Sequence, residues 1–146
     1  LEVAGLCDIR ICGESSRFGA PISKLGLVMG FKELGALRDL VGNAGALEIL
    51  LEGRILEAPE ALQKGIVSRI VADDAVEAEA MATARRIADG APLVHRWHRK
   101  FLGRLADPKP LSEDEIKEAY ACFDTEDFKT GYQAFLDKKK PDFEGR

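Results

Sequence analysis

Residues 7–31 read CDIRICGESSRFGAPISKLGLVMGF, a stretch in which short apolar runs alternate with turn-forming residues. The apolar segment Ile9–Cys12 is predicted to be a buried strand, and the Gly-Glu-Ser-Ser that follows it a turn. Pro21 cannot continue a helix and favours an extended conformation at Ala20. The stretch therefore predicts short strands, the β part of a mixed α/β core.

The residues up to Gly90 alternate predicted helices with one more strand. Apolar residues at helical spacing predict three helices, at residues 31–41, 46–51 and 58–64. The β-branched run Ile66–Val71 is bounded by turn-forming residues and is predicted to be a strand. Asp74 is expected to cap a further helix, because Glu77 follows it at the capping-box spacing.

The rest of the chain shows helical patterns and no strand signals. Ser112 and Glu115 form a predicted capping box at the start of one helix, and Thr125 is expected to cap the last one. We therefore predict two domains, a mixed α/β part over residues 1–90 and a helical part over residues 91–146.

The composition is that of a globular protein. The 146 residues are 46% hydrophobic and 32% charged, and the formal net charge of −4 argues against a nucleic-acid or membrane-surface binder. No apolar run approaches the roughly 20 residues that span a bilayer. The three cysteines lack metal-site spacing, so no disulfide framework and no metal site are expected. Cys7 and Cys12 are predicted to be buried, and a reducing, cytoplasmic compartment follows.

Three blocks of the chain resemble the crotonase superfamily, the enoyl-CoA hydratases and isomerases: Cys7–Gly30, Leu51–Val71 and the ending after Phe123. Members usually carry Gly-Gly-Gly-x-Glu-Leu-Ala-x-x-Cys-Asp, and this chain opens at LEVAGLCD without an initiator Met. The resemblance implies the C-terminal part of a longer protein. Residues 1–90 would be the C-terminal part of an α/β, crotonase-like ββα spiral, and residues 91–146 an all-helical trimerisation region.

The same resemblance assigns catalytic roles to two residues. Glu2 matches the first acid/base carboxylate of the family, because it stands five residues before the Cys-Asp pair. From the residues alone, a solvated surface glutamate is the alternative. Gly30 matches the glycine whose backbone N–H helps to hold the reacting water. The second family carboxylate would follow Phe-Gly-x-Pro, where this chain has Ile22, which cannot hold a proton.

The loop before the first long helix also departs from the family pattern. Met29, Lys32 and Glu33 stand where relatives have Pro, Gly and Gly. Either Glu33 or another polar group substitutes for the missing acid, or the chemistry differs; an ordinary solvated helix residue is the alternative for Glu33. The family's oxyanion donors lie upstream of Leu1, so the truncated chain is expected to be inactive alone.

The ending FDTEDFKTGYQAFLDKKKPDF resembles the family's C-terminal motif. In relatives, the residues matching Phe135 and Lys138 contact the adenine and phosphate end of coenzyme A in a neighbouring subunit. A cation suits a phosphate and an aromatic face suits adenine, whereas a solvated lysine run is the alternative. The resemblance also implies a homo-oligomer, a trimer or a hexamer.

These features lead to one predicted function with two alternatives. The prediction is an enoyl-CoA hydratase-like lyase or isomerase that acts on acyl-CoA thioesters through enolate stabilisation, in fatty-acid or related metabolism. Coenzyme A belongs to the substrate, and no separate cofactor is expected. Because Ile22 replaces a carboxylate, an acyl-CoA decarboxylase or thioester hydrolase of the same fold is the first alternative. A non-catalytic acyl-CoA-binding protein is the second.

Overall fold

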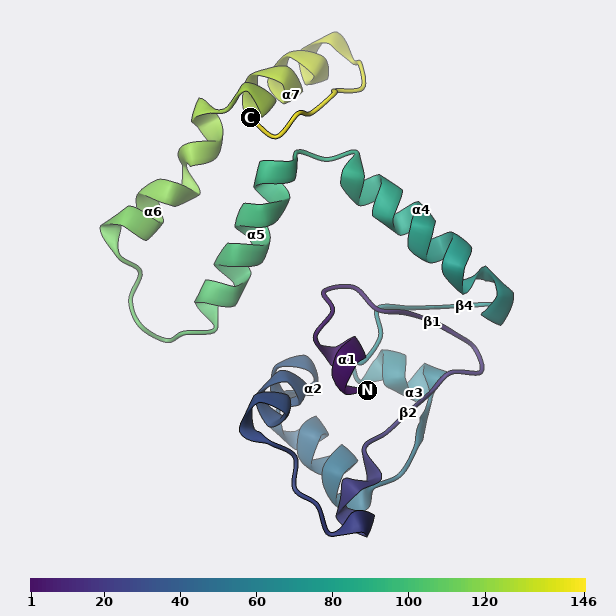
Figure 1. The fold of residues 1–146 in the computed structure, drawn as a ribbon. Coiled ribbons are helices and arrows are strands. Elements are labelled where there is room, and N and C mark those ends of the chain that lie inside the picture. Colours follow the sequence, from purple (N-terminus) through teal and green to yellow (C-terminus); the bar gives the residue numbers. More distant parts are fainter. The chain divides into compact units, whose positions relative to one another are not determined.

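The computed structural model describes residues 1–146, which are mostly helical with a few short strands (Figure 1). The chain divides into two compact units, Leu1–Met81 and Ala82–Arg146, and the division falls within helix α4 (Val76–Ala88). The domain boundary near Gly90 suggested by the sequence stays a prediction. None of the helices combines the length and the apolar content that crossing a bilayer requires.

The first unit interleaves helices and short strands before it reaches α4. In chain order these are α1 (Glu2–Gly5), β1 (Ile11–Gly13), β2 (Arg17–Phe18), the 3-10 helix η1 (Pro21–Leu25), α2 (Phe31–Glu52), β3 (Leu56–Glu57), α3 (Ala58–Gln63), β4 (Arg69–Val71) and the 3-10 helix η2 (Asp73–Ala75). The second unit continues with α5 (Pro92–Leu105), α6 (Glu113–Ala119), the 3-10 helix η3 (Ala121–Asp124) and α7 (Glu126–Asp137).

The strands form two separate two-stranded sheets. β1 runs parallel to β4, with Ile11 opposite Arg69 and Gly13 opposite Val71. β2 runs antiparallel to β3. The parallel pair joins segments that lie far apart in the sequence, and so it holds the two ends of the first unit together.

Both predicted strands are present, but each begins later than predicted. The strand expected at Ile9–Cys12 begins at Ile11, and the one expected at Ile66–Val71 begins at Arg69. The side chain of Arg10 explains the second difference, because its guanidinium donates to the carbonyl of Ile66 at 2.6 Å. That carbonyl is engaged outside the ladder, and Ile66 is buried in the core instead.

One hydrophobic cluster forms the core of the first unit. Its largest fully buried side chains are Ile49, Leu56 and Ile66. Cys12 belongs to the cluster, as predicted, and burial raises the pKa of its thiol. Cys7 is exposed, so that prediction was wrong; Cys7 lies in the connection between α1 and β1 rather than in a strand.

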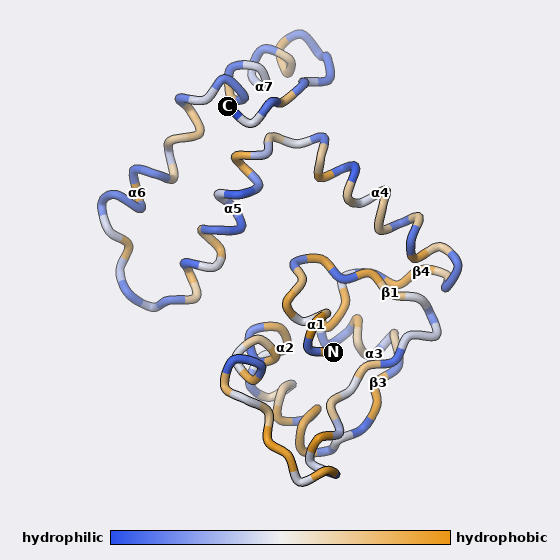
Figure 2. Tube along the Cα trace, in the orientation of Figure 1, coloured by the Kyte–Doolittle hydropathy of each residue, from blue (hydrophilic) through white to orange (hydrophobic).

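Hydrophobic residues also extend beyond this core. Figure 2 shows them along the segment between η1 and α2. Leu27 and Val28 of this segment are exposed, as is Leu25 at the end of η1. The segment therefore offers an apolar surface that the first unit itself does not bury.

Helix α2 contains the first two predicted helices in one run of 22 residues. Gly42 interrupts the run with φ of 72° and ψ of 169°, a conformation that only glycine adopts without strain. The predicted break at Gly42-Asn43 is thus confirmed as a kink. Gly53 ends the helix in the left-handed region, and its N–H donates to the carbonyl of Ile49 at 3.1 Å.

The predicted cap at Asp74 is wrong. Asp74 lies inside η2, and α4 begins only at Val76. The 3-10 turn moves the start of the helix beyond the reach of the expected capping box. The neighbouring Asp73 has a different role, because its Oδ1 accepts the backbone N–H of Ser15 at 3.0 Å.

The two caps predicted in the second unit are present. Ser112 Oγ accepts the N–H of Glu115 at 3.2 Å, and Glu115 Oε2 accepts the N–H of Ser112 at 2.7 Å, which completes a capping box. Thr125 Oγ1 accepts the N–H of Phe128 at 3.0 Å. These caps fix the starts of α6 and α7.

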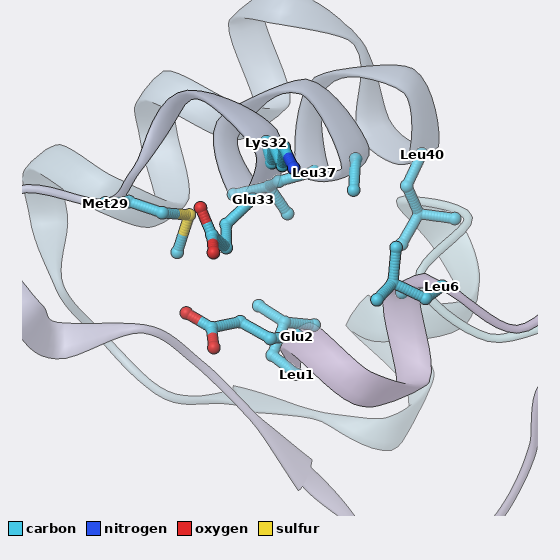
Figure 3. Close-up of a pocket in the computed structure, with 10 residues that line it drawn as sticks. Leu1, Glu2, Leu6, Met29, Lys32, Glu33, Leu37 and Leu40 are labelled. Atoms are coloured by element: carbon cyan, nitrogen blue, oxygen red, sulfur yellow. The ribbon is translucent and has the colours of Figure 1, made fainter.

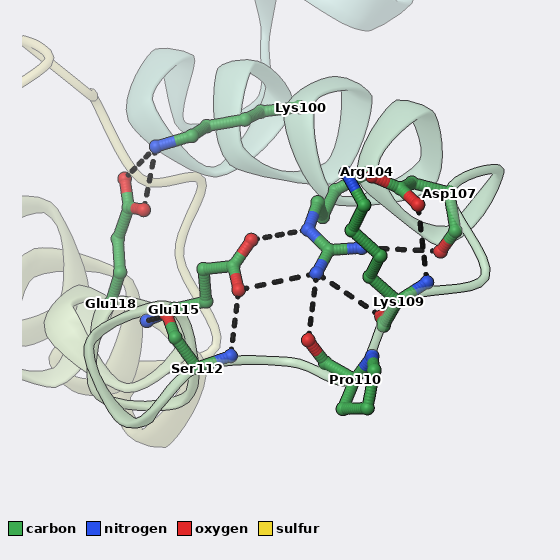
Figure 4. A network of polar contacts seen from close by, with 8 residues as sticks. All are labelled: Lys100, Arg104, Asp107, Lys109, Pro110, Ser112, Glu115 and Glu118. Atoms are coloured by element: carbon green, nitrogen blue, oxygen red, sulfur yellow. Dashed lines mark hydrogen bonds and ion pairs between the residues drawn. The ribbon is translucent and has the colours of Figure 1, made fainter.

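Arg104 fastens the connection between α5 and α6 (Figure 4). Its guanidinium forms an ion pair with Glu115. It also donates to the carbonyl oxygens of Asp107, Lys109 and Pro110, at 3.2, 3.2 and 3.0 Å. A second ion pair, Lys100–Glu118, joins the same two helices at 2.5 and 2.6 Å.

Candidate active site

A pocket of about 280 Å³ lies between α1 and the first turns of α2 (Figure 3). Its walls are mainly apolar, with three charged residues among them. The lining residues are Leu1, Glu2, Gly5, Leu6, Met29, Lys32, Glu33, Ala36, Leu37 and Leu40. An apolar cavity with few polar groups is the usual form of a small-molecule site.

Helical spacing explains how α2 contributes to this pocket. Glu33, Leu37 and Leu40 follow one another at i, i+4 and i+7, which places them on one face of the helix. Leu37 is buried in the core and anchors this face. Helix α1 packs against α2 and supplies the opposite wall.

Gly30 lies at the start of α2 and directly beside Glu33. It is the N-cap residue of the helix, and its carbonyl accepts the N–H of Leu34 at 2.9 Å. A β-carbon at position 30 would lie 2.5 Å from Oε2 of Glu33. Because Gly30 has no side chain, the Glu33 carboxylate can lie against the backbone at the N-terminus of the helix.

Glu2 and Glu33 line the pocket from opposite walls, and both residues are exposed to solvent in this chain. Figure 3 shows their carboxylates directed towards each other, with the side chain of Met29 beside them. Within the chain, neither carboxylate has a hydrogen-bond or ion-pair partner. Glu2 and Glu33 thus share one pocket, and Gly30 lies beside Glu33 without lining the pocket itself.

Ile22 is not part of this pocket wall. It lies in η1, is half-buried and packs against the core cluster. Its carbonyl accepts the N–H of Leu27 at 3.2 Å. Position 22 thus contributes packing to the first unit and no titratable group to the pocket.

Phe135 and Lys138 adjoin at the end of α7, in the second unit. The N–H of Lys138 donates to the carbonyl of Phe135 at 3.3 Å, and Phe135 is 81% exposed. Lys138 has φ of 54° and ψ of 42°, and it is the only residue other than glycine with positive φ. Lys139 and Lys140 are each ion-paired with an aspartate, whereas the ammonium of Lys138 has no such partner.

The family model for enoyl-CoA hydratase/isomerase matches residues 1–146. The chain belongs to the enoyl-CoA hydratase/isomerase family. Among solved structures of this family, an enoyl-CoA hydratase/carnithine racemase from Magnetospirillum magneticum is 52% identical, with a TM-score of 0.96. The match covers 99% of this chain and 54% of that one.

Curated members of the family give the same result. A probable enoyl-CoA hydratase of Mycobacterium bovis is 35% identical over 99% of this chain and 57% of its own length. A probable mitochondrial enoyl-CoA hydratase of Arabidopsis thaliana is 32% identical over 99% of this chain and 49% of its own length. The chain therefore spans about half the length of the family members it matches.

The family motifs in the sequence point to Glu2 and Gly30 but not to the apolar wall of the pocket. Helical spacing marks Leu34 and Leu37 as one apolar face, yet it does not separate residues that face a cavity from residues that face the core. Leu6 and Leu40 have no sequence signal of their own. Their place in the wall depends on the packing of α1 against α2.

Proposed function

We propose that this chain supplies an acid/base carboxylate and part of the acyl pocket of an enoyl-CoA hydratase. The reaction would be the hydration of a trans-2-enoyl-CoA thioester through an enolate, in fatty-acid or related acyl-CoA metabolism. The observation that carries the proposal is the carboxylate of Glu2, which lines an apolar pocket opposite Glu33. Apolar walls suit an acyl chain, and a carboxylate among them can transfer a proton at its reactive carbons.

The end of α7 supports a coenzyme A contact. An exposed aromatic ring at Phe135 offers a stacking face for adenine, and the unpaired ammonium of Lys138 offers a charge for a phosphate. Lys138 also keeps a backbone conformation that lysine disfavours, and such strain is often found at ligand-binding positions. We therefore assign substrate binding to both residues.

The proposed architecture follows the family. Residues 1–90 would complete a ββα spiral in a protein of the full family length, and the helices beyond them would form a trimer, or a hexamer of two trimers. Exposed aromatic side chains at Tyr120, Phe123 and Phe135 support self-association of these helices. Light scattering on the full-length protein would give the oligomeric state, and a cytoplasmic location stays part of the proposal.

A second reaction type is supported by Ile22. The position that carries the second carboxylate in relatives is here apolar and packed against the core. Decarboxylation or thioester hydrolysis on the same scaffold is therefore the alternative to hydration.

The test uses a full-length protein in which this chain is completed to the length of its relatives. Short trans-2-enoyl-CoA is supplied, and loss of the conjugated thioester absorbance is followed together with the product. Formation of 3-hydroxyacyl-CoA supports hydration. Release of carbon dioxide from a malonyl-type thioester, or of free coenzyme A thiol, without hydration supports the alternative. Tight binding of acyl-CoA without turnover would indicate a non-catalytic acyl-CoA-binding protein. Residues 1–146 alone are expected to show no turnover.

A further inference from the structure

The pocket holds a carboxylate to which the proposed function gives no role. Glu33 enters from α2, on the wall opposite Glu2, and the two carboxylates are directed towards each other (Figure 3). In the sequence the two residues are far apart and belong to different helices. Their meeting in one cavity is a property of the fold.

The carboxylate of Glu33 lies close to the backbone at the start of α2. Glu33 is the third residue of the helix, and its carboxylate rests against Gly30, where a β-carbon would lie 2.5 Å from its Oε2. The positive end of the helix dipole favours an acidic residue anywhere in this first turn. That preference explains why an acid is tolerated there, but not why its carboxylate is directed into an apolar pocket towards Glu2.

Hydration needs two proton sites. One group must take a proton from water while the water oxygen bonds to the β-carbon, and another must deliver a proton to the α-carbon. We propose that Glu33 is the second acid/base residue of this site, paired with Glu2; this inference rests on the hydratase function proposed above. It fills the role for which Ile22 has no titratable group.

The proton balance of the step follows from the position of Glu33 beside Gly30, where the family resemblance places the reacting water. Ionised Glu33 accepts a proton from water as the water oxygen bonds to the β-carbon, and the π electrons of the double bond move towards the thioester as an enolate. Protonated Glu2 then gives its proton to the α-carbon. Water has been added as H and OH, and exchange with solvent returns the pair to its starting protonation.

This division of roles predicts two separable activities. Glu2 alone serves the α-carbon: in its ionised form it should take an α-proton from a saturated acyl-CoA to leave the enolate, and after exchange with solvent it should return deuterium to the same carbon. Glu33 is needed only for the water. In the full-length protein, Glu33→Gln should therefore lower hydration by about 10²- to 10⁴-fold while α-proton exchange and acyl-CoA binding stay near wild type. Retained exchange also shows that the variant is folded.

Two further variants complete the experiment. Glu33→Asp keeps a titratable carboxylate on a shorter side chain, and it should retain more hydration activity than Glu33→Gln. Glu14→Gln removes an exposed glutamate outside the pocket and should change neither activity. This control measures the effect of losing a negative charge elsewhere on the same unit.

The outcomes separate this inference from the proposed function. Hydration lost with exchange retained in Glu33→Gln supports the pair. Full hydration activity in Glu33→Gln overturns the pair and leaves the hydratase function standing. Equal loss of hydration and exchange in both Glu33→Gln and Glu33→Asp assigns Glu33 a structural role and also overturns the pair. A wild-type protein that does not hydrate enoyl-CoA overturns both proposals.

Discussion

Asp127 holds Gly145 by two hydrogen bonds, because the backbone N–H of Gly145 donates to Oδ2 at 3.0 Å and to Oδ1 at 3.2 Å. The N–H of Glu144 donates to Oδ1 at 2.9 Å, and the N–H of Asp127 donates to the carbonyl of Arg146 at 2.9 Å. Asp127 is only 4% exposed. One buried carboxylate in the first turn of α7 thus fastens the last residues of the chain.

Asp127→Ala should destabilise the protein. It leaves the tail N–H groups without their buried acceptor, which we expect to lower the free energy of unfolding by about 1–3 kcal/mol. Urea unfolding measures the loss. Asp142→Ala, at an exposed position in the same tail, is the matched control and should stay within about 0.5 kcal/mol of wild type. Equal effects of the two substitutions would contradict this account of the tail.

The ion pair between Arg104 and Glu115 should make the free energy of unfolding depend on pH in the acidic range. The hydrogen bond from Arg104, followed by that from the backbone N–H of Ser112, lowers the pKa of Glu115 from its usual 4.5 to about 2. Glu115 is therefore charged in the folded protein at pH values where it is protonated in the unfolded chain. Its contribution to stability is complete above pH 4.5 and is lost as the pH falls towards 2.

Glu115→Gln tests this dependence. Urea midpoints measured at pH 7, 4 and 3 should fall less steeply for the variant than for wild type, because Gln does not titrate. Glu113→Gln changes an exposed carboxylate in the same first turn of α6 and should keep the wild-type slope. Identical slopes for wild type and Glu115→Gln would show that the pair does not couple folding to protons.

The left-handed conformation of Lys138 predicts a stability gain on substitution. The left-handed conformation destabilises the folded protein by about 1–2 kcal/mol when the residue has a β-carbon. Glycine removes this strain, but its greater conformational freedom stabilises the unfolded chain and offsets part of the gain. Lys138→Gly should therefore raise the free energy of unfolding by about 0.5–1 kcal/mol. Lys139→Gly, at the next position without positive φ, should not stabilise. A loss of stability in Lys138→Gly would contradict the backbone argument.

Substitution of Lys138 should weaken ligand binding, although the glycine substitution is expected to stabilise the fold. If Lys138 contacts a coenzyme A phosphate, Lys138→Ala in the full-length protein should weaken acyl-CoA binding by about 0.5–2 kcal/mol. The loss should shrink as salt screens the contact. Calorimetry at low and high salt measures both. Unchanged affinity at low salt would assign Lys138 to the solvated end of the chain.

Local signals in the sequence predicted the elements that local interactions determine. The caps at Ser112 and Thr125 and the break at Gly42 each depend on residues within one or two turns, and the structure has all three. The strand starts were wrong because β1 is paired with β4, so its ends depend on residues far along the chain. The cap at Asp74 failed because a 3-10 turn shifts the helix start.

The candidate site likewise combines features that the sequence predicts with features that depend on tertiary packing. Motif resemblance pointed to Glu2 and Gly30 and showed that Ile22 replaces a carboxylate. Whether Glu33 is a solvated residue or a partner of Glu2 depends on how α1 packs against α2, which spacing alone does not give. The apolar wall around Leu40 could not be predicted from the sequence for the same reason.

The most direct test of the account is the hydration rate of Glu2→Gln in the full-length protein. Gln keeps the shape of the side chain and its hydrogen bonding but cannot transfer a proton. We expect hydration of a short trans-2-enoyl-CoA to fall by about 10²- to 10⁴-fold. Acyl-CoA affinity, measured in parallel, should stay close to wild type. A Glu2→Gln protein that hydrates the substrate at the wild-type rate would contradict the central claim that this carboxylate carries the chemistry.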